Sequence, residues 1–334
     1  MRVAIFQGEG VGGRPSRDAL IDIWKEELKD VPEIEKITFF RRQAEEDCDV
    51  AFSDADAVLG TFIPNDFFTK EFCDRHPDLK YVSCGSHGYG RIDFKLLKER
   101  GIFFTNTVYS QRTIAEYAFA LLNDICHDVA LHSNYYKKEH FMPENYVSRT
   151  SWILTPQLEL YEKTIGIIGL GNIGLCAAQI AKGYGMKVLA YSRTPKEGPE
   201  YEGISQVPFQ ELLAQSDIIS IHCPLTDNTR GMLDREAFQS MKKGVILINT
   251  ARGEIIEEQA LEEALQDGTV YAAGLDVLSG EPLKEPCSLM KYPNVKVTPH
   301  IAWAPAESRI RGVHVEAQQF KDWLKGKPVH NLAE

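Results

Sequence analysis

The chain has 334 residues, of which 43% are hydrophobic and 25% are charged, as in ordinary soluble globular proteins. This length predicts one or two domains with substantial cores. The 37 basic and 48 acidic residues give a net charge of −11, and no basic block offsets it. This balance argues against a nucleic acid or an anionic membrane as a partner, so an anionic ligand must be held by a few local Arg or Lys residues.

Seven cysteines are scattered along the chain without any CxxC pair: Cys48, Cys73, Cys84, Cys126, Cys176, Cys223 and Cys287. An odd number of separated cysteines is typical of reduced, mostly buried thiols. No apolar run has the roughly 18–20 residues that a membrane span needs, and the N-terminus is too short and polar for a signal peptide. His127 and His132 are five residues apart, which is not zinc-ligand spacing. We therefore expect a cytoplasmic protein without a metal site.

The first hundred residues alternate short apolar runs with amphipathic stretches. The apolar runs predict buried strands at 2–6, 56–60, 80–85 and 102–106, and the amphipathic stretches predict helices at 16–30 and 66–76. This alternation is typical of a small open α/β domain.

Residues 113–139 are apolar on more than one side, which predicts one long helix buried between domains or subunits. The following stretch, 141–163, is irregular and rich in aromatic residues. We interpret it as a connection that packs against another surface, such as a partner subunit.

From Thr164 the alternation becomes regular and predicts six strands, at 164–169, 187–191, 217–223, 244–250, 272–277 and 295–300. Helices are expected between most of them, at 172–185, 209–216, 234–241 and 257–268. This order indicates a doubly wound parallel sheet. The tail, 308–326, is an amphipathic helix with no strand after it, so we expect it to return to the first domain and make that domain discontinuous.

The sequence GLGNIG opens the helix expected after the first of these six strands. Gly169 permits a tight turn, Gly171 permits close approach of a pyrophosphate, and Gly174 permits close packing of helix and strand. Asn172 and Ile173 begin the helix, whose N-terminus provides unpaired N–H donors for an anion. The context of strand, turn and helix indicates a dinucleotide site rather than a simple turn.

The next strand ends in the turn YSRTP, where a ribose-binding acid is usual at about this distance from the glycines. Here Ser192, Arg193 and Thr194 stand in its place. Without a carboxylate the repulsion of a 2′-phosphate is removed, and the guanidinium and two hydroxyls can bind it. The turn therefore favours NADP(H) over NAD(H). The alternative is a solvated Arg193 in a site that tolerates NAD(H).

Three further segments follow expected strands: INTARGEII, GLDVLSGEP and VTPHIAWAP. They carry Arg252, Asp276, Glu281 and His300. Because ligands bind outside the carboxyl ends of the strands in a doubly wound sheet, separate strands can bring these residues to one cleft. Taken singly, each residue also has a structural interpretation, as a core histidine, a turn residue, a strand end or a helix entry.

The motifs GLGNIG, INTARG, GLDVLSGEP and TPHIA, with GSHGYGRID, TIAEYAFALL and HCPLTDNTRGML, closely resemble the D-2-hydroxyacid dehydrogenase family. The resemblance implies a discontinuous, flavodoxin-like substrate domain, 1–107 and 302–334, into which a Rossmann cofactor domain, 108–301, is inserted. It also implies a homodimer joined through the cofactor domains.

The resemblance assigns the catalytic roles to three residues. Arg252 would bind the substrate carboxylate, His300 would be the acid–base residue, and Glu281 would be its partner. Further residues are implied to line the cofactor: Cys223, Pro224, Thr229, Thr250, Ala251 and Asp276, the last near the nicotinamide carboxamide. Ser86, His87, Gly88 and Trp303 are implied to contact the substrate.

The chemistry of a 2-keto acid requires the same residue types. Arg252 can hold the carboxylate through two parallel hydrogen bonds and help to polarise the carbonyl. Negative charge builds on the carbonyl oxygen as the nicotinamide delivers hydride to C2. Protonated His300 can supply a proton there and act as the base in reverse, and a nearby Glu281 carboxylate favours the charged imidazolium.

HIAWA and YSRTP resemble the glycerate dehydrogenase and hydroxypyruvate/glyoxylate reductase members of the family. A bulky indole at Trp303 would narrow the pocket and favour a small 2-keto acid. Gly90 and Arg91 depart from the family's more usual Asp-Asn pair, which leaves the geometry of this loop open. The alternatives are a D-lactate-type or broader 2-keto acid reductase and, from another class, a nucleotide-sensing protein like the corepressors that share this fold.

Overall fold

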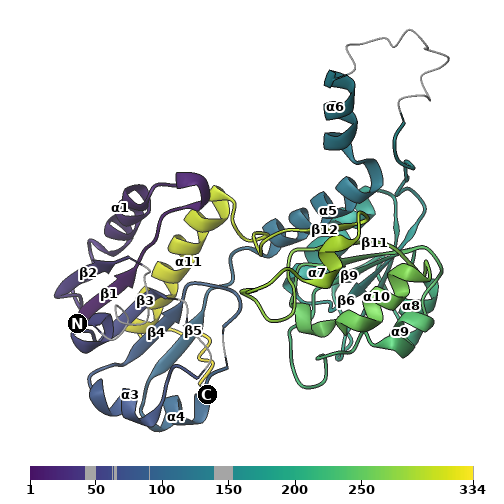
Figure 1. The fold of residues 1–334 in the computed structure, drawn as a ribbon. Helices are drawn as coiled ribbons and strands as arrows, with labels where there is room; N and C mark the ends of the chain where they lie inside the picture. The colour runs from purple at the N-terminus through teal and green to yellow at the C-terminus, as the bar shows by residue number, and fades with distance from the viewer. Residues whose placement is uncertain (42–49, 62, 64–65, 90, 139–152, 334) are drawn as a thin grey trace. The chain divides into compact units, whose positions relative to one another are not determined.

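A computed structural model describes residues 1–41, 50–61, 63, 66–89, 91–138 and 153–333. The chain forms two compact units, which are described separately (Figure 1). Unit 1 comprises Met1–Ser110 and Trp303–Glu334, and unit 2 comprises Gln111–Ala302. The C-terminal segment thus joins the N-terminal segment in one unit. The divisions lie a few residues from the 107/108 and 301/302 boundaries that the sequence suggested.

Unit 1 is built on a five-stranded parallel sheet in the order β2-β1-β3-β4-β5, the flavodoxin-like order. Its strands are β1 (Arg2–Phe6), β2 (Lys36–Phe40), β3 (Ala57–Thr61), β4 (Tyr81–Cys84) and β5 (Phe103–Asn106). The helices of this unit whose bounds lie within the described residues are the short η1 (Val11–Gly13), α1 (Arg17–Leu28), α3 (Lys70–Arg75), α4 (Phe94–Glu99) and α11 (Ala306–Leu324). All the strand pairings are parallel, as expected for an α/β unit.

The C-terminal helix α11 is part of the core of unit 1. Its buried stripe, Val313, Ala317 and Phe320, follows helical spacing and packs with Trp24 of α1 and Tyr81 of β4 in one hydrophobic cluster. A second cluster, which includes Phe52 and Phe104, covers the other face of the sheet. The amphipathic pattern of the tail therefore reflects burial against the first sheet.

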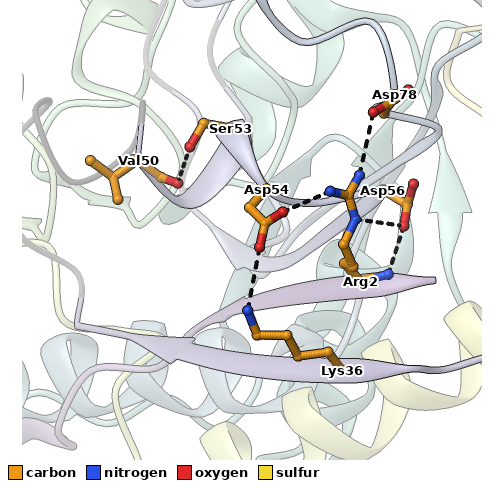
Figure 2. A network of polar contacts seen from close by, with 7 residues as sticks. All are labelled: Arg2, Lys36, Val50, Ser53, Asp54, Asp56 and Asp78. Carbon is orange, nitrogen blue, oxygen red and sulfur yellow. Dashed lines mark hydrogen bonds and ion pairs between the residues drawn. The ribbon is translucent and has the colours of Figure 1, made fainter.

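Ion pairs connect the amino ends of the strands of unit 1 (Figure 2). The Arg2 guanidinium lies 2.6 Å from Asp54, 3.5 Å from Asp56 and 3.4 Å from Asp78, and Lys36 lies 3.3 Å from Asp54. Most of these groups are exposed, so each pair contributes little to stability. The network lies at the end of the sheet opposite the carboxyl ends, and we assign it a structural role.

Unit 2 contains a seven-stranded parallel sheet in the order β12-β11-β10-β9-β6-β7-β8. Its strands are β6 (Thr164–Ile168), β7 (Lys187–Tyr191), β8 (Ser205–Gln206), β9 (Ile218–Ile221), β10 (Val245–Asn249), β11 (Val270–Leu275) and β12 (Val295–Val297). Read from β8, the first six strands have the Rossmann order, and β12 extends the sheet by one strand. The six strands expected from the sequence all form, and β8 is an additional short edge strand.

Helices cover both faces of the second sheet. α5 (Gln111–His127) and α7 (Asn172–Gly183) pack on one face. α8 (Phe209–Gln215), α9 (Arg235–Gln239) and α10 (Glu258–Gln266) pack on the other. Three short 3-10 helices also belong to the unit: η3 (Pro199–Tyr201), η4 (Gly253–Ile255) and η5 (Ser288–Lys291). Two hydrophobic layers therefore enclose the sheet, which explains its nearly continuous apolar strands.

The prediction of a single helix over 113–139 is wrong in one respect. In the structure the helix breaks at Asp128, whose φ of 45° lies in the left-handed region, and a second helix, α6 (Val129–Lys138), begins there. Aspartate tolerates this conformation, and the Asp128 carboxylate lies 2.7 Å from the Lys296 ammonium on β12. α5 has one buried face, whereas α6 has no buried residue and projects from unit 2 (Figure 1).

Two further expectations can be compared with the structure only in part. Most of the aromatic connection expected over 141–163 lies outside the described residues, as does Cys48. In the part of the chain that the structure describes, no helix is both long and apolar enough to cross a membrane.

Candidate active site

The glycine-rich turn after β6 is packed so closely that two of its positions have no room for a side chain. Gly169 has a φ of 98°, and a Cβ there would lie 2.6 Å from the backbone nitrogen of Cys223. A Cβ at Gly174 would lie 2.0 Å from the carbonyl oxygen of Gly169. Both positions therefore exclude any other residue, because the turn is packed against the segment after β9 and against α7.

Gly171 has the opposite environment. A Cβ at this position would meet no atom within 4 Å, and Gly171 is the N-cap of α7 without a side-chain capping bond. The first N–H groups of α7, which begins at Asn172 and Ile173, have no acceptor within the helix. Such N–H groups bind phosphate oxygens, so the turn fits the pyrophosphate of a dinucleotide.

The segment after β9 lines the same turn. Burial lowers the pKa of His222 to about 4, so its ring is neutral, and its Nε2 lies 2.9 Å from the Ser220 hydroxyl. Thr229 donates to the carbonyl of Pro224 at 2.7 Å and accepts the Thr226 N–H at 2.8 Å. The Thr229 hydroxyl thus shapes the loop that follows Cys223 and Pro224.

Thr250 and Ala251 follow β10 at the carboxyl end of the sheet. The Thr250 hydroxyl is buried and has no hydrogen-bond partner among the residues that the structure describes. The Ala251 N–H donates to Oδ1 of Asn249 at 2.9 Å. An unsatisfied buried hydroxyl at this end of the sheet fits a site that binds a polar ligand.

The turn after β7 presents the residues expected to select the nucleotide. Ser192 is half-buried, whereas Arg193 and Thr194 are exposed. The side chain of Gln206, on β8, accepts the Lys196 N–H at 2.8 Å and donates to the Lys196 carbonyl at 2.7 Å. These two hydrogen bonds fix the end of the turn. The sequence did not indicate Gln206, because its role depends on an edge strand only two residues long.

Arg252 is held at the start of η4, directly after β10. Asn249 donates to the Arg252 carbonyl at 2.9 Å, and Arg252 Nη1 donates to the Ala251 carbonyl at 2.7 Å. A Cβ on Gly253 would lie 2.0 Å from the backbone of Leu278. The loop that carries Arg252 therefore packs directly on the segment that leads to Glu281.

His300 and Glu281 form a pair. Nδ1 of His300 lies 2.8 Å from Oε2 of Glu281, and Oε1 of Glu281 accepts the Leu278 N–H at 2.6 Å. The carboxylate is thus oriented by the backbone at one oxygen and orients the imidazole with the other. The His300 side chain remains 40% exposed, so a ligand can approach the imidazole ring.

Asp276 holds the turn that carries His300. This fully buried residue accepts the Thr298 hydroxyl at 2.6 Å and the Ile301 N–H at 2.9 Å through Oδ1, and the Ala302 N–H at 2.8 Å through Oδ2. Its carbonyl accepts the His300 N–H at 2.8 Å. Both carboxylate oxygens are therefore occupied by the protein. The family resemblance implied that Asp276 lies near the nicotinamide, whereas no sequence pattern indicated Thr298 as its partner.

Ser86, His87, Gly88 and Trp303 belong to unit 1. Ser86 donates to the Gly88 carbonyl at 2.5 Å, and Asn106 donates to the His87 carbonyl at 2.6 Å. These bonds fix the loop after β4. Arg91 forms an ion pair with Asp66, while Gly90 lies outside the described residues. In the described ranges, no group of three or more His, Cys, Asp or Glu could hold a metal.

The Rossmann sheet, the open glycine turn and the His300–Glu281 pair beside Arg252 define a nicotinamide-dependent dehydrogenase. The model of the "D-isomer specific 2-hydroxyacid dehydrogenase, NAD binding domain" family matches residues 120–302. The chain belongs to the D-2-hydroxyacid dehydrogenase family, and it is an oxidoreductase that uses a nicotinamide cofactor.

Several relatives match most of the chain. A hydroxypyruvate reductase from Blautia hydrogenotrophica is 39% identical over 280 residues, which cover 83% of this chain and 84% of the relative. A glyoxylate reductase from Korarchaeum cryptofilum is 34% identical over 316 residues, covering 93% and 89%. Among solved structures, an acyclic imino acid reductase in complex with NADPH and D-Arg is 28% identical with a TM-score of 0.80, covering 99% of this chain and 100% of that one.

Proposed function

We propose that the protein reduces a small 2-keto acid, hydroxypyruvate or glyoxylate, to the D-2-hydroxy acid, with NADPH as the preferred cofactor. The observation that carries the proposal is the oriented His300–Glu281 pair, 2.8 Å apart, on loops that pack beside Arg252. The hydroxypyruvate and glyoxylate reductases among the relatives support the substrate class.

Each of the four site residues of unit 2 has its own task in this reaction. Arg252 binds the carboxylate of the keto acid with a planar pair of donors. When bound, the nicotinamide supplies a hydride to C2 of the keto acid. His300 donates the proton that the carbonyl oxygen needs, and Glu281 stabilises the imidazolium before that transfer. Asp276 keeps the backbone of His300 in place through its bonds to the turn.

The substrate loop and the domain roles are part of the same proposal. Unit 2 binds the cofactor, and unit 1 contributes Ser86, His87, Gly88 and Trp303 to substrate binding. A bulky Trp303 favours a small substituent on C2, which supports glyoxylate and hydroxypyruvate over larger keto acids. Activity with pyruvate greater than with either of these two would favour the D-lactate-type alternative.

The preference for NADPH depends on Arg193. We expect Arg193→Ala to raise the KM for NADPH about 10- to 100-fold and to leave the KM for NADH nearly unchanged, because only NADPH carries a 2′-phosphate for the guanidinium. Lys187→Ala, which removes an exposed cation at the other end of β7, is the matched control and should alter neither KM. Equal changes for the two cofactors would show that Arg193 is only a surface residue.

We further propose a homodimer that forms through α6. This ten-residue helix has no buried residue, and Val129 (67%), Leu131 (43%) and Tyr136 (43%) are exposed, as are Ile153 (52%) and Leu154 (42%) further along the chain. A short helix is marginal on its own, and a cluster of exposed apolar side chains is typical of an interface.

Sedimentation equilibrium should give about twice the 37.6 kDa mass of the chain. Leu131→Glu should weaken the dimer, whereas Met290→Glu, at a similarly exposed residue on η5, should not. A monomer at micromolar concentration would contradict the proposal.

The six described cysteines are free thiols, which supports a reducing compartment, and we propose the cytoplasm. Cell fractionation checks that location.

A further inference from the structure

The side chain of Glu316, on α11, is buried in unit 1 at only 3% exposure. Its Oε1 accepts the N–H of Gly60, at the carboxyl end of β3, at 2.6 Å. Its Oε2 lies 3.3 Å from the position that a Cβ on Gly85 would occupy. The carboxyl therefore lies directly beneath the first residue of the loop Gly85–Tyr89, which follows β4.

No cation compensates this carboxyl. In the part of unit 1 that the structure describes, no ion pair to Glu316 is present, and the Gly60 N–H is its hydrogen-bond donor. The buried Ser83 hydroxyl lies close to Glu316 but has no hydrogen-bond partner among the described residues. β4 also places Tyr81 and Cys84 near it, and both are neutral acids whose pKa is raised by burial. On α1, Glu27 is paired with His314 and Lys321, so that side adds no free cation. β3 carries no titratable residue.

Burial raises the pKa of Glu316 to about 7 from an ordinary value of 4.5. The carboxyl is therefore neutral in slightly acidic solution and becomes a buried, unpaired anion as the pH rises through neutrality. The ionised and neutral forms of Glu316 need different partners: the anion needs donors such as the Gly60 N–H, whereas the neutral acid needs an acceptor for its own proton.

We propose that Glu316 is a positioning residue for substrate binding: its protonation state sets the charge beneath the loop Gly85–Tyr89 and the backbone where that loop begins. An anionic keto acid on this loop is repelled by the ionised carboxylate and tolerated by the neutral acid. Substrate binding is therefore coupled to proton uptake by Glu316. The inference rests on the proposed function, because it takes this loop as the substrate loop.

The matched variants are Glu316→Gln and Asp322→Asn. Glutamine keeps the size of the side chain and an oxygen for the Gly60 N–H but cannot ionise. Asp322 is a carboxyl on the same helix whose pKa is lowered, first by a hydrogen bond from Gln318 and then by Lys327. It stays ionised over neutral pH, so its removal should leave the pH dependence unchanged.

The first readout needs no substrate. We expect the NMR amide signals of Gly60 and Gly85 to titrate with a midpoint near pH 7 in the wild type and in Asp322→Asn, but not in Glu316→Gln. A raised carboxyl pKa contributes stability that is lost as the pH rises through it, so the wild-type unfolding constant should rise about tenfold more than that of Glu316→Gln between pH 6 and pH 8. Flat wild-type amide signals would overturn the proposal even if Glu316→Gln failed to fold.

The second readout is the KM for glyoxylate with NADPH. The ratio of the wild-type KM to the Glu316→Gln KM should rise about fivefold from pH 6 to pH 8, since a buried charge acts through a low effective dielectric. Dividing by the variant's KM removes the contribution of His300, which both proteins share. A ratio that does not change with pH would overturn the coupling. If the wild type reduced no 2-keto acid, the proposed function and the substrate coupling would both fail, while the amide titration would still report on Glu316.

Discussion

Replacement of His300 by asparagine is expected to lower kcat for 2-keto acid reduction about 10²- to 10⁴-fold, the range that general acid catalysis contributes. His300 has a φ of 55°, and asparagine accepts this left-handed conformation better than alanine does. The turn held by Asp276 should therefore survive, and the loss should reflect the missing proton donor. Stopped-flow measurement of NADPH oxidation under saturating substrate checks this expectation.

The companion variant Glu281→Gln separates the roles within the pair. The amide keeps a hydrogen bond to Nδ1 at the observed 2.8 Å but no longer stabilises the imidazolium by charge. We expect a moderate loss of kcat and a shift of the reductive pH profile to lower pH. If the profile stays where it is in the wild type, Glu281 only positions His300. Unchanged turnover in His300→Asn would show that another group donates the proton.

The second large effect is expected at Arg252. Arg252→Ala should raise the KM for the keto acid about 10- to 100-fold, because hydrogen bonds to a charged group are lost, and should lower kcat about 10²- to 10³-fold, because the carbonyl is no longer polarised. Steady-state kinetics over a range of keto acid concentrations separates the two effects. The cofactor Kd should stay near its wild-type value.

Arg252→Lys is the matched control for geometry. Lysine keeps the charge but cannot offer two parallel donors in one plane, so it should recover part of the KM and little of kcat. Full recovery by lysine would mean that Arg252 acts only as a charge. Normal KM and kcat in Arg252→Ala would refute the assignment of this residue to the substrate carboxylate.

The strands of both sheets that carry the site residues could be predicted from the sequence, because their apolar runs are buried on both faces and end at recognisable turns. β2 was missed: its five residues are partly exposed at the edge of the sheet, and their pattern does not alternate clearly. The break at Asp128 was also missed, since apolar residues continue on both sides of it and only the backbone conformation differs.

The candidate site could be predicted as far as its reactive side chains but not their supports. Gly169, Arg252, Glu281 and His300 are recognisable by residue type and spacing. Asn249, Thr298 and Gln206 act through hydrogen bonds that form only once the loops are folded. Local sequence patterns do not predict such hydrogen bonds.

Glu316 is the clearest example of a residue whose environment could not be predicted from the sequence. A glutamate within an amphipathic helix is expected to face solvent, and its burial follows only from the packing of α11 on the sheet of unit 1. The polar demands of a buried carboxyl become visible only when the ends of β3 and β4 are in place.

Reduction of a small 2-keto acid with NADPH is tested most directly by steady-state kinetics of the full chain with glyoxylate, hydroxypyruvate, pyruvate and phenylpyruvate, each with NADPH and with NADH. The proposed function predicts the highest kcat/KM for hydroxypyruvate or glyoxylate with NADPH, and lower values for pyruvate and phenylpyruvate. Binding of the nucleotide without oxidation of either reduced cofactor by any of the four acids would contradict it.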